Sequence, residues 1–240
     1  MQRQIITLTA SRPLTADVVE LRFAADTSAI VRPGQFVNLA LEGLFLRRPI
    51  SVCDWDADGL TLVVKVVGKG TARLAALRPG AALDALVGLG NGYDVDACPA
   101  DPVLAGGGVG VPPLYGLARA LIAAGKRPAV ALGFNRKEEI FYDDAFRALG
   151  LPVAVATADG SAGAKGFVTD ILPEGRYVCC CGPEAMLKAV HARAAGGQFS
   201  FEARMGCGFG ACMGCTCRTI AGPKRICKEG PVLRREEILW

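Results

Sequence analysis

The sequence has a single histidine and no long hydrophobic run. His191 cannot by itself build a Ser-His-Asp triad, a histidine-rich metal centre or a two-histidine Rieske site. The longest uncharged run, residues 102–118, contains five glycines and three prolines, so it does not predict a membrane span. The first residues alternate apolar and polar side chains and lack the apolar core of a signal peptide. We therefore expect a cytoplasmic protein with no membrane partner.

Strong net charge is also lacking. The chain has 27 basic and 23 acidic side chains, for a net charge of +4, with no run of Lys and Arg interleaved with aromatics. Nucleic-acid binding is therefore a poor hypothesis. The 51% hydrophobic content is ordinary for a globular protein, and 240 residues suffice for one large domain or two to three small ones.

Glycine and cysteine are abundant, with 30 and 10 residues respectively. Five cysteines fall within a window of 21 residues near the C-terminus: Cys207, Cys212, Cys215, Cys217 and Cys227. Such clustering indicates a metal site more than the dispersed disulfide framework of a secreted domain.

The alternation of strand, helix and turn patterns divides the chain into three regions. Residues 1–98 contain β-prone runs at 4–9, 18–23, 35–41, 50–53 and 60–67 and a short helix at 71–77, which predicts a small antiparallel barrel. In residues 99–196, strands at 102–105, 129–133, 153–157 and 177–181 alternate with helices at 114–124, 138–149 and 183–195. This alternation predicts a doubly wound parallel sheet of the α/β class. Residues 197–240 show little periodicity and form a small cysteine-rich domain.

Four of the clustered cysteines have the spacing of an iron–sulfur site. The order Cys207-x4-Cys212-x2-Cys215-x11-Cys227 begins with the C-x4-C-x2-C step of plant-type [2Fe–2S] centres. The glycines between residues 206 and 214 permit unusual dihedrals and leave backbone amides free to hydrogen-bond sulfur. A structural zinc site is the alternative, although zinc sites more often pair two C-x2-C steps.

The remaining cysteines look structural. Cys217 lies two residues beyond Cys215 and is predicted not to be a ligand, while the cysteines at 53, 98 and 179–181 look like small buried residues. The basic residues near Cys227, at positions 224, 225 and 228, either raise the cluster potential or only solvate the loop.

A glycine-rich turn joins the first strand of the second region to its first helix. Gly106, Gly107, Gly108 and Gly110 precede two prolines, and such a turn lets a phosphate approach the backbone at a helix N-terminus. Val111 stands where a strict G-x-G-x-x-G motif has its third glycine. Tight packing without a ligand therefore remains an alternative.

Together these features resemble the ferredoxin–NADP reductase superfamily, in which a flavin-binding barrel precedes a pyridine-nucleotide domain. The segment Arg48-Pro49-Ile50-Ser51 matches the R-x-[YIF]-[ST] flavin motif of that superfamily. The resemblance implies that Arg48 contacts the flavin pyrophosphate and Ser51 the isoalloxazine.

Two further segments carry the same resemblance. The strand and phosphate-binding turn that follow the flavin motif correspond to Val63-Val64-Lys65 and Gly70-Thr71. The C-G-P segment, whose cysteine lies near the nicotinamide in this superfamily, corresponds to Cys181-Gly182-Pro183. These matches imply cofactor contacts at each position.

More narrowly, the chain resembles the electron-transfer subunits of NAD-linked dihydroorotate dehydrogenase over essentially its whole length. The most specific matches are LRRPIS, AGGGVGVPPL, ATADGS with GFVTD, and EARMGCGFGACMGCTC followed by ICKEGPV. The resemblance implies FAD, one [2Fe–2S] cluster, NAD and a separate FMN-containing catalytic subunit, in a heterotetramer of two plus two subunits. Electrons would run from FMN through the cluster and FAD to NAD⁺ in pyrimidine (UMP) biosynthesis.

The implied cofactors are chemically coherent, because nicotinamide exchanges a hydride, a cluster carries single electrons and a flavin connects the two. No organic-substrate site is evident. The 13 residues after Cys227 are too few for the separate ferredoxin fold of oxygenase reductases, which have similar modules.

Two other functions stay open. One is the small subunit of a related NAD(P)H–ferredoxin reductase or sulfide dehydrogenase, although such relatives commonly have an aspartate in place of one cluster cysteine. The other is a non-enzymatic, metal-stabilised interaction module. Arg136 and Lys137 follow the second strand of the nucleotide region, where they either read a 2′-phosphate or form a solvated turn. The preference for NAD over NADP therefore rests on the resemblance.

Overall fold

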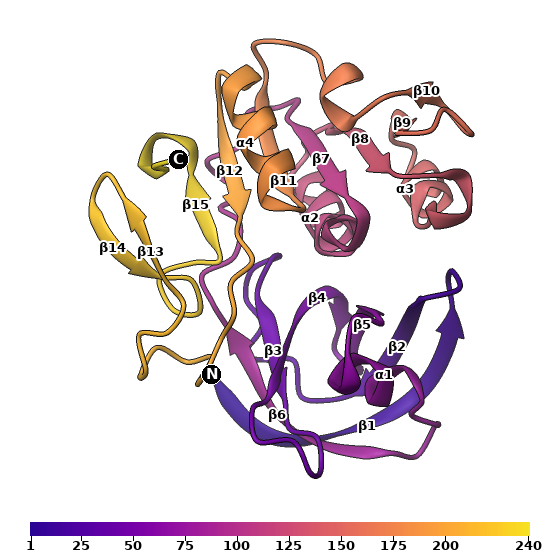
Figure 1. The fold of residues 1–240 in the computed structure, drawn as a ribbon, viewed down its shortest axis with the longest axis vertical. Coiled ribbons are helices and arrows are strands. Elements are labelled where there is room, and N and C mark those ends of the chain that lie inside the picture. The colour runs from indigo at the N-terminus through magenta and orange to yellow at the C-terminus, as the bar shows by residue number, and fades with distance from the viewer.

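The computed structural model describes residues 1–240. They form a closed six-stranded barrel, a seven-stranded sheet and a two-stranded hairpin. In Figure 1 the barrel lies below the sheet, and the hairpin, in yellow, lies beside both. None of the helices is long and apolar enough to cross a membrane.

The barrel closes because β1 pairs with both β2 and β6, in the order β1-β2-β5-β4-β3-β6. Its elements are β1 (Gln2–Pro13), β2 (Val18–Ala24), β3 (Phe36–Leu39), β4 (Arg48–Asp56), β5 (Gly59–Lys65), α1 (Lys69–Ala75) and β6 (Ala82–Leu89). Alternate side chains such as Leu21 and Phe23 are fully buried inside it. The sequence does not predict β6, because its alanines and leucines favour helix over strand.

The sheet has the order β10-β9-β8-β7-β11-β12-β15, and only β15 runs antiparallel to its neighbour. Its strands are β7 (Val103–Gly107), β8 (Ala129–Phe134), β9 (Val153–Thr157), β10 (Ala164–Lys165), β11 (Tyr177–Cys181), β12 (Gly196–Ser200) and β15 (Val232–Arg234). Strand order reverses between β7 and β11, whose carboxyl ends meet there, and such switch points are where α/β sheets bind ligands.

The C-terminal region therefore contributes to this sheet through most of β12 and through β15. The rest of it begins with an extended segment and a loop at residues 206–215, called the cysteine loop below. The hairpin β13 (Thr216–Thr219) and β14 (Gly222–Arg225) and a 3-10 turn at Arg235–Glu237 follow. Other 3-10 turns lie at Gly108–Gly110, Lys137–Glu139 and Val168–Asp170.

The helices are α2 (Val111–Ala123), α3 (Asp143–Ala148) and α4 (Glu184–Arg193). The helix predicted at 138–149 is wrong over its first half, where a 3-10 turn is followed by extended residues. Tyr142 has φ 68° and places its hydroxyl 2.6 Å from a carboxylate oxygen of Glu20 in the barrel. This contact between the barrel and the sheet outweighs the local helical tendency.

Apolar packing joins the three regions. Leu114 and Leu117 of α2 lie in one core cluster with Cys53 and Val63 of the barrel. On the other face of the sheet, α4 and the cysteine loop share a cluster that also contains Phe36 of β3. The cysteine loop is thus packed against both the barrel and the sheet.

Candidate cofactor and metal sites

A cavity of about 320 Å³ lies where the barrel meets the carboxyl edge of the sheet. Its barrel wall contains Pro49, Ile50, Ser51, Val63, Val64, Lys65 and Thr71. The opposite wall contains Val109, Pro112 and Pro113 at the start of α2, Cys181 at the end of β11, and residues from Ser200 to Met205. An elongated ligand here would touch two strands of the barrel and the switch point of the sheet together.

The turn before α1 is shaped by contacts among the predicted flavin residues. Thr71 Oγ1 accepts hydrogen bonds from the amides of Val67 and Gly68, at 2.9 and 3.1 Å. A Cβ on Gly70 would lie 2.1 Å from Arg48 Nε, so this position has no room for a side chain. Arg48 also donates to the carbonyls of Leu46 and Arg47, which leaves its guanidinium beside the turn.

A second cavity, of about 550 Å³, adjoins the first. It is lined by Gly107, Gly108 and Pro183 together with residues from the ends of β8 and α4. Lys65, Val109 and Glu202 line both cavities. Ligands that occupied the two cavities together would therefore meet beside these three side chains.

The glycine-rich turn serves two different purposes. A Cβ on Gly110 would lie 2.2 Å from the carbonyl oxygen of Cys181, and one on Gly106 would lie 3.0 Å from Val111. These two glycines allow β7, β11 and the start of α2 to pack closely. Gly107 and Gly108 line the second cavity. A Cβ on Gly107 would also lie 2.4 Å from Met186 Sδ, whereas Gly108, with φ 50°, has open space beside it. Close packing and ligand access are therefore divided among the glycines that the sequence analysis grouped together.

Cys181 and Glu202 flank the boundary of the two cavities. Burial, followed by the negative charge of Glu202, raises the pKa of the Cys181 thiol to about 12, so the thiol stays neutral at pH 7. Partial enclosure by the cavity walls raises the pKa of the Glu202 carboxyl. Glu202 belongs to no cofactor motif that the sequence indicates. The only available signal was its position between the end of a strand and the cysteine loop.

Three of the four predicted ligand cysteines lie on the loop before β13, Cys227 follows β14, and the four are arranged in two pairs. The Cys207 and Cys212 amides each lie 3.4 Å from the other's sulfur, and the Cys227 amide lies 3.4 Å from Cys215 Sγ. Mononuclear zinc requires four ligands around one point, whereas two irons each take two protein thiolates. The pairing fits the two-iron cluster better.

The loop also provides hydrogen-bond donors and space for sulfur. Burial raises the pKa of the Cys207 thiol, but the amides of Phe209, Cys212 and Ala211 outweigh it and lower this pKa to about 6. A Cβ on Gly206 would lie 3.1 Å from Cys212 Sγ. Burial and the nearby Cys215 raise the pKa of Cys227 to about 12, an effect that a bound cation would reverse.

Contacts from other elements hold this loop in place. Asn38 Nδ2 on β3 donates to the Cys207 carbonyl at 3.1 Å, and Arg225 Nη1 donates to the Gly210 carbonyl at 2.5 Å. Met213 has φ 60°, which is a strained value for a residue with a side chain. Cys217 lies on β13 and lines a separate cavity next to Cys215.

The basic residues that the sequence left ambiguous are mostly paired with acids. Arg225 forms an ion pair with Glu229, and Lys224 one with Glu237 at 2.6 Å. Arg136 Nε lies 3.1 Å from Glu139, whose side chain lines the second cavity. The Glu139 carboxylate therefore lies beside Arg136, one of the two basic residues that could contact a 2′-phosphate.

Comparisons with known proteins identify the family of the chain. Residues 202–239 match the family described as the iron–sulfur cluster binding domain of dihydroorotate dehydrogenase B. A relative from Bacillus mycoides (strain KBAB4) is 38% identical over 258 residues, with 100% of this chain and 99% of its own length covered. A relative from Geobacillus kaustophilus (strain HTA426) is 39% identical over 254 residues, covering 99% and 98%. Both are named dihydroorotate dehydrogenase B (NAD(+)), electron transfer subunit.

The chain belongs to this family of electron transfer subunits.

Solved structures place the family's fold among flavin reductases. An NADH-dependent reduced ferredoxin–NADP oxidoreductase, reported for flavin-based electron bifurcation, matches with a TM-score of 0.89 and 31% identity, covering 98% of this chain and 89% of its own. The ferredoxin NADP⁺ reductase of Neisseria gonorrhoeae, with bound FAD and NADP, matches with a TM-score of 0.67 and 17% identity over 80% of this chain and 90% of its own. The second match concerns the fold alone.

Proposed function

We propose that this protein is the electron-transfer subunit of a dihydroorotate dehydrogenase and passes electrons from its partner to NAD⁺ in pyrimidine (UMP) biosynthesis. The supporting observation is that two adjoining cavities share Lys65, Val109 and Glu202, while the cysteine loop packs beside the first cavity. The three cofactor positions are thus contiguous. When bound, a flavin between a nicotinamide and a [2Fe–2S] cluster couples hydride transfer to single-electron transfer.

We assign FAD to the first cavity. Ser51 and the strand Val63-Val64-Lys65 line it, with Pro49 and Ile50 beside them, and Arg48, Gly70 and Thr71 shape the adjacent turn where a pyrophosphate would bind. The apolar side chains of Pro112 and Pro113 on α2 and of Phe201 and Met205 line the opposite wall of this space.

We assign NAD to the second cavity. Gly107 and Gly108 present backbone to a phosphate, Pro183 lines the cavity, and Gly106, Gly110 and Gly182 allow close packing behind it. Cys181 and Glu202 would flank the nicotinamide where it meets the flavin. The neutral Cys181 thiol serves there as a packing contact.

We assign the cluster to Cys207, Cys212, Cys215 and Cys227, in the two pairs described above. Because its relatives are named as electron transfer subunits, a catalytic partner subunit is implied. We propose that this partner contains FMN and that two copies of each subunit assemble. The ten free cysteines also suit a reducing compartment, and we propose the cytoplasm.

The first test is the visible spectrum and cofactor content of anaerobically purified protein, expressed with and without the presumed catalytic subunit. We expect one FAD and two irons with sulfide per chain, and bleaching of the visible bands by NADH. Dihydroorotate-dependent reduction of NAD⁺ should require the partner.

Other outcomes would contradict this function. NADH-dependent reduction of ferredoxin without dihydroorotate activity would favour the related reductases. A colourless protein with one zinc per chain and no flavin would favour an interaction module.

A further inference from the structure

The segment that connects the barrel to the sheet holds one member of a close cysteine pair. Cys98 lies in this linker, between β6 and β7, and its sulfur is 3.6 Å from the sulfur of Cys179 on β11. Cys179 is fully buried and Cys98 is 5% exposed. Neither cysteine lines the two cofactor cavities or belongs to the cysteine loop.

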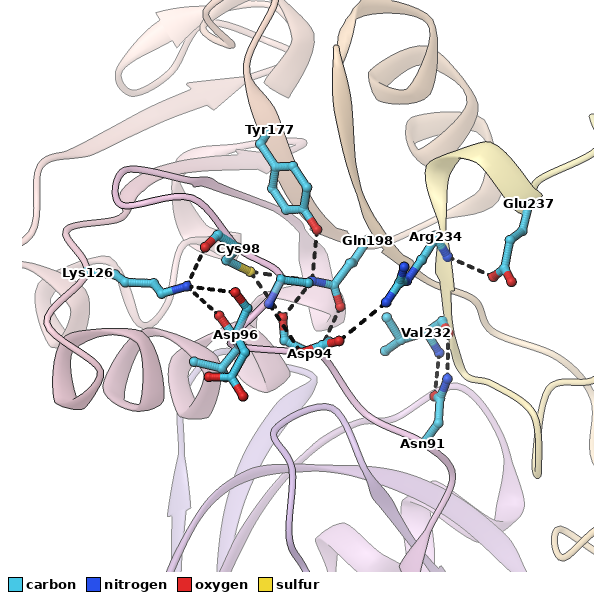
Figure 2. A network of polar contacts seen from close by, with 12 residues as sticks. Asn91, Asp94, Asp96, Cys98, Lys126, Tyr177, Gln198, Val232, Arg234 and Glu237 are labelled. Atoms are coloured by element: carbon cyan, nitrogen blue, oxygen red, sulfur yellow. Dashed lines mark hydrogen bonds and ion pairs between the residues drawn. The ribbon is translucent and has the colours of Figure 1, made fainter.

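A polar network fixes the linker around Cys98 (Figure 2). The buried Gln198 accepts from the Asp94 amide at 2.7 Å and donates to the Asp94 carbonyl at 2.9 Å. Its Nε2 also lies 3.4 Å from Cys98 Sγ. Lys126 Nζ donates to the carbonyls of Val95, at 2.7 Å, and Cys98. The Cys98 sulfur is therefore held in place between one donor, Gln198 Nε2, and one acceptor, the Asp94 carbonyl at 3.4 Å.

The two thiols differ in acidity. The hydrogen bond from Cys179, helped by the positive charge of Lys126, lowers the pKa of Cys98 against the opposing effect of burial. The same contact, together with burial, raises the pKa of Cys179 well above its usual value. The contact thus favours ionisation of Cys98 over ionisation of Cys179, which is the asymmetry of an attacking and a resolving thiol.

The pair is also reachable from solvent on one side only. Cys98 lines an open surface cavity of about 530 Å³, together with Ala97, Pro99, Tyr177 and Gly196. Cys179 does not line this cavity and lies deeper in the sheet. Cys98 is therefore the member of the pair that a small oxidant in this cavity would meet first.

We propose that Cys98 and Cys179 form a reversible thiol pair that hydrogen peroxide oxidises to a disulfide. The Cys98 thiolate attacks one peroxide oxygen, the O–O bond breaks, and the departing oxygen leaves as water after taking a proton. The sulfur of Cys179 then attacks Cys98 Sγ and loses its proton, and the sulfenic oxygen leaves as a second water. In sum, two thiols lose two electrons and two protons to peroxide, and a dithiol reductant reverses the step.

The bond would change the packing at the centre of the molecule. The sulfurs must approach from 3.6 Å to about 2.05 Å, which draws the linker toward β11. Cys179 precedes by two residues Cys181, which lines the first cavity. Oxidation therefore ties the interdomain linker to the strand that ends at the cofactor sites.

In the test, anaerobically prepared holoprotein is treated with limiting hydrogen peroxide and the remaining thiols are alkylated. Peptides are then mapped by mass spectrometry with fragmentation. We expect the main new product to be a peptide that links Cys98 to Cys179, lighter by two hydrogens and restored by dithiothreitol. In Cys179→Ser the link should vanish and Cys98 should proceed to sulfinic acid. The matched control Cys180→Ser, altered at the next residue of β11, should keep the link.

The wild-type map alone decides the matter if a variant fails to fold. A link from Cys98 to a cysteine other than Cys179, in wild type or in Cys179→Ser, or a Cys98 that stays fully alkylatable would overturn the proposal. Flavin and iron content are measured in the same samples, so failure of the electron-transfer function is distinguishable from failure of the thiol pair.

Discussion

At the scale of single residues, the ten cysteines show how environment decides the chemistry of one side chain. Backbone amides lower the pKa of Cys207 to about 6, which prepares a thiolate for a metal ion. Burial raises that of Cys181 to about 12, which keeps it neutral where it lines the first cavity. Cys215 and Cys217 are two residues apart, yet only the Cys215 sulfur accepts a hydrogen bond from the amide of another predicted ligand, Cys227.

That difference gives a residue-level prediction. Cys215→Ala should abolish the visible absorbance of the cluster and reduce the iron content to near zero, because one iron loses a thiolate. Cys217→Ala should keep two irons per chain, because its sulfur lies outside the two cysteine pairs. Iron and sulfide analysis, with flavin content as the folding check, measures both. Loss of the cluster in Cys217→Ala would show that our ligand assignment is wrong.

At the scale of elements, ion pairs hold the seam of the barrel around β6. Asp84 on β6 accepts from Arg3 on β1 at 2.6 Å and from Arg47, just before β4, at 2.8 Å. Arg47 also donates to the carbonyls of Asn38 and Asp84, at 3.2 and 3.0 Å. Hydrogen bonds from Arg3 and then Arg47 lower the pKa of the Asp84 carboxyl. The strands that meet at β6 are thus joined by side chains as well as by backbone.

Asp84→Asn should destabilise the protein by about 1 kcal/mol at pH 7, or a few degrees in thermal midpoint. A carboxyl with a lowered pKa stabilises the folded state fully above its unfolded pKa, and the effect is lost as pH falls through the folded value. The difference from wild type should therefore shrink below about pH 4. Thermal melts across pH measure this, with the exposed Asp58→Asn as control. A difference that grows toward low pH would contradict the ion-pair account.

At the scale of the whole molecule, the cysteine loop lies beside the barrel and the sheet and still presents apolar side chains to solvent. Phe209 and Met213, both within the loop, are 45% and 53% exposed. Electrons must enter the chain near the cluster if they come from a partner subunit. Large apolar side chains at such a point are typical of the centres of protein interfaces.

Phe209→Ser should therefore weaken binding of the catalytic subunit about tenfold or more, through loss of buried apolar area. Reduction of an artificial acceptor by NADH should stay close to wild type, because the two cofactor cavities are untouched. Titration of one purified subunit with the other measures the affinity. Ile122→Ser, which alters an exposed apolar residue on α2, is the matched control and should bind normally. Equal affinities for both variants would place the interface elsewhere.

The sequence by itself determined the features that depend on local spacing. The cysteine spacing indicated an iron–sulfur loop, and the alternating patterns predicted the barrel and the parallel sheet. Most residues of the segments at 48–51, 63–65 and 181–183 line the two cavities. These signals are readable because dihedral freedom and strand or helix periodicity act over a few neighbouring residues.

Only the tertiary structure decided which distant residues meet. Tyr142 has a non-helical backbone conformation and hydrogen-bonds to Glu20. Glu202 lines both cavities, and Cys98 contacts Cys179, which lies 81 residues away in the sequence. No local pattern encodes these contacts, because they arise from the closure of the barrel and the docking of its linker on the sheet. Packing of the whole chain therefore set the environment, and with it the acidity and accessibility, of residues that the sequence left looking ordinary.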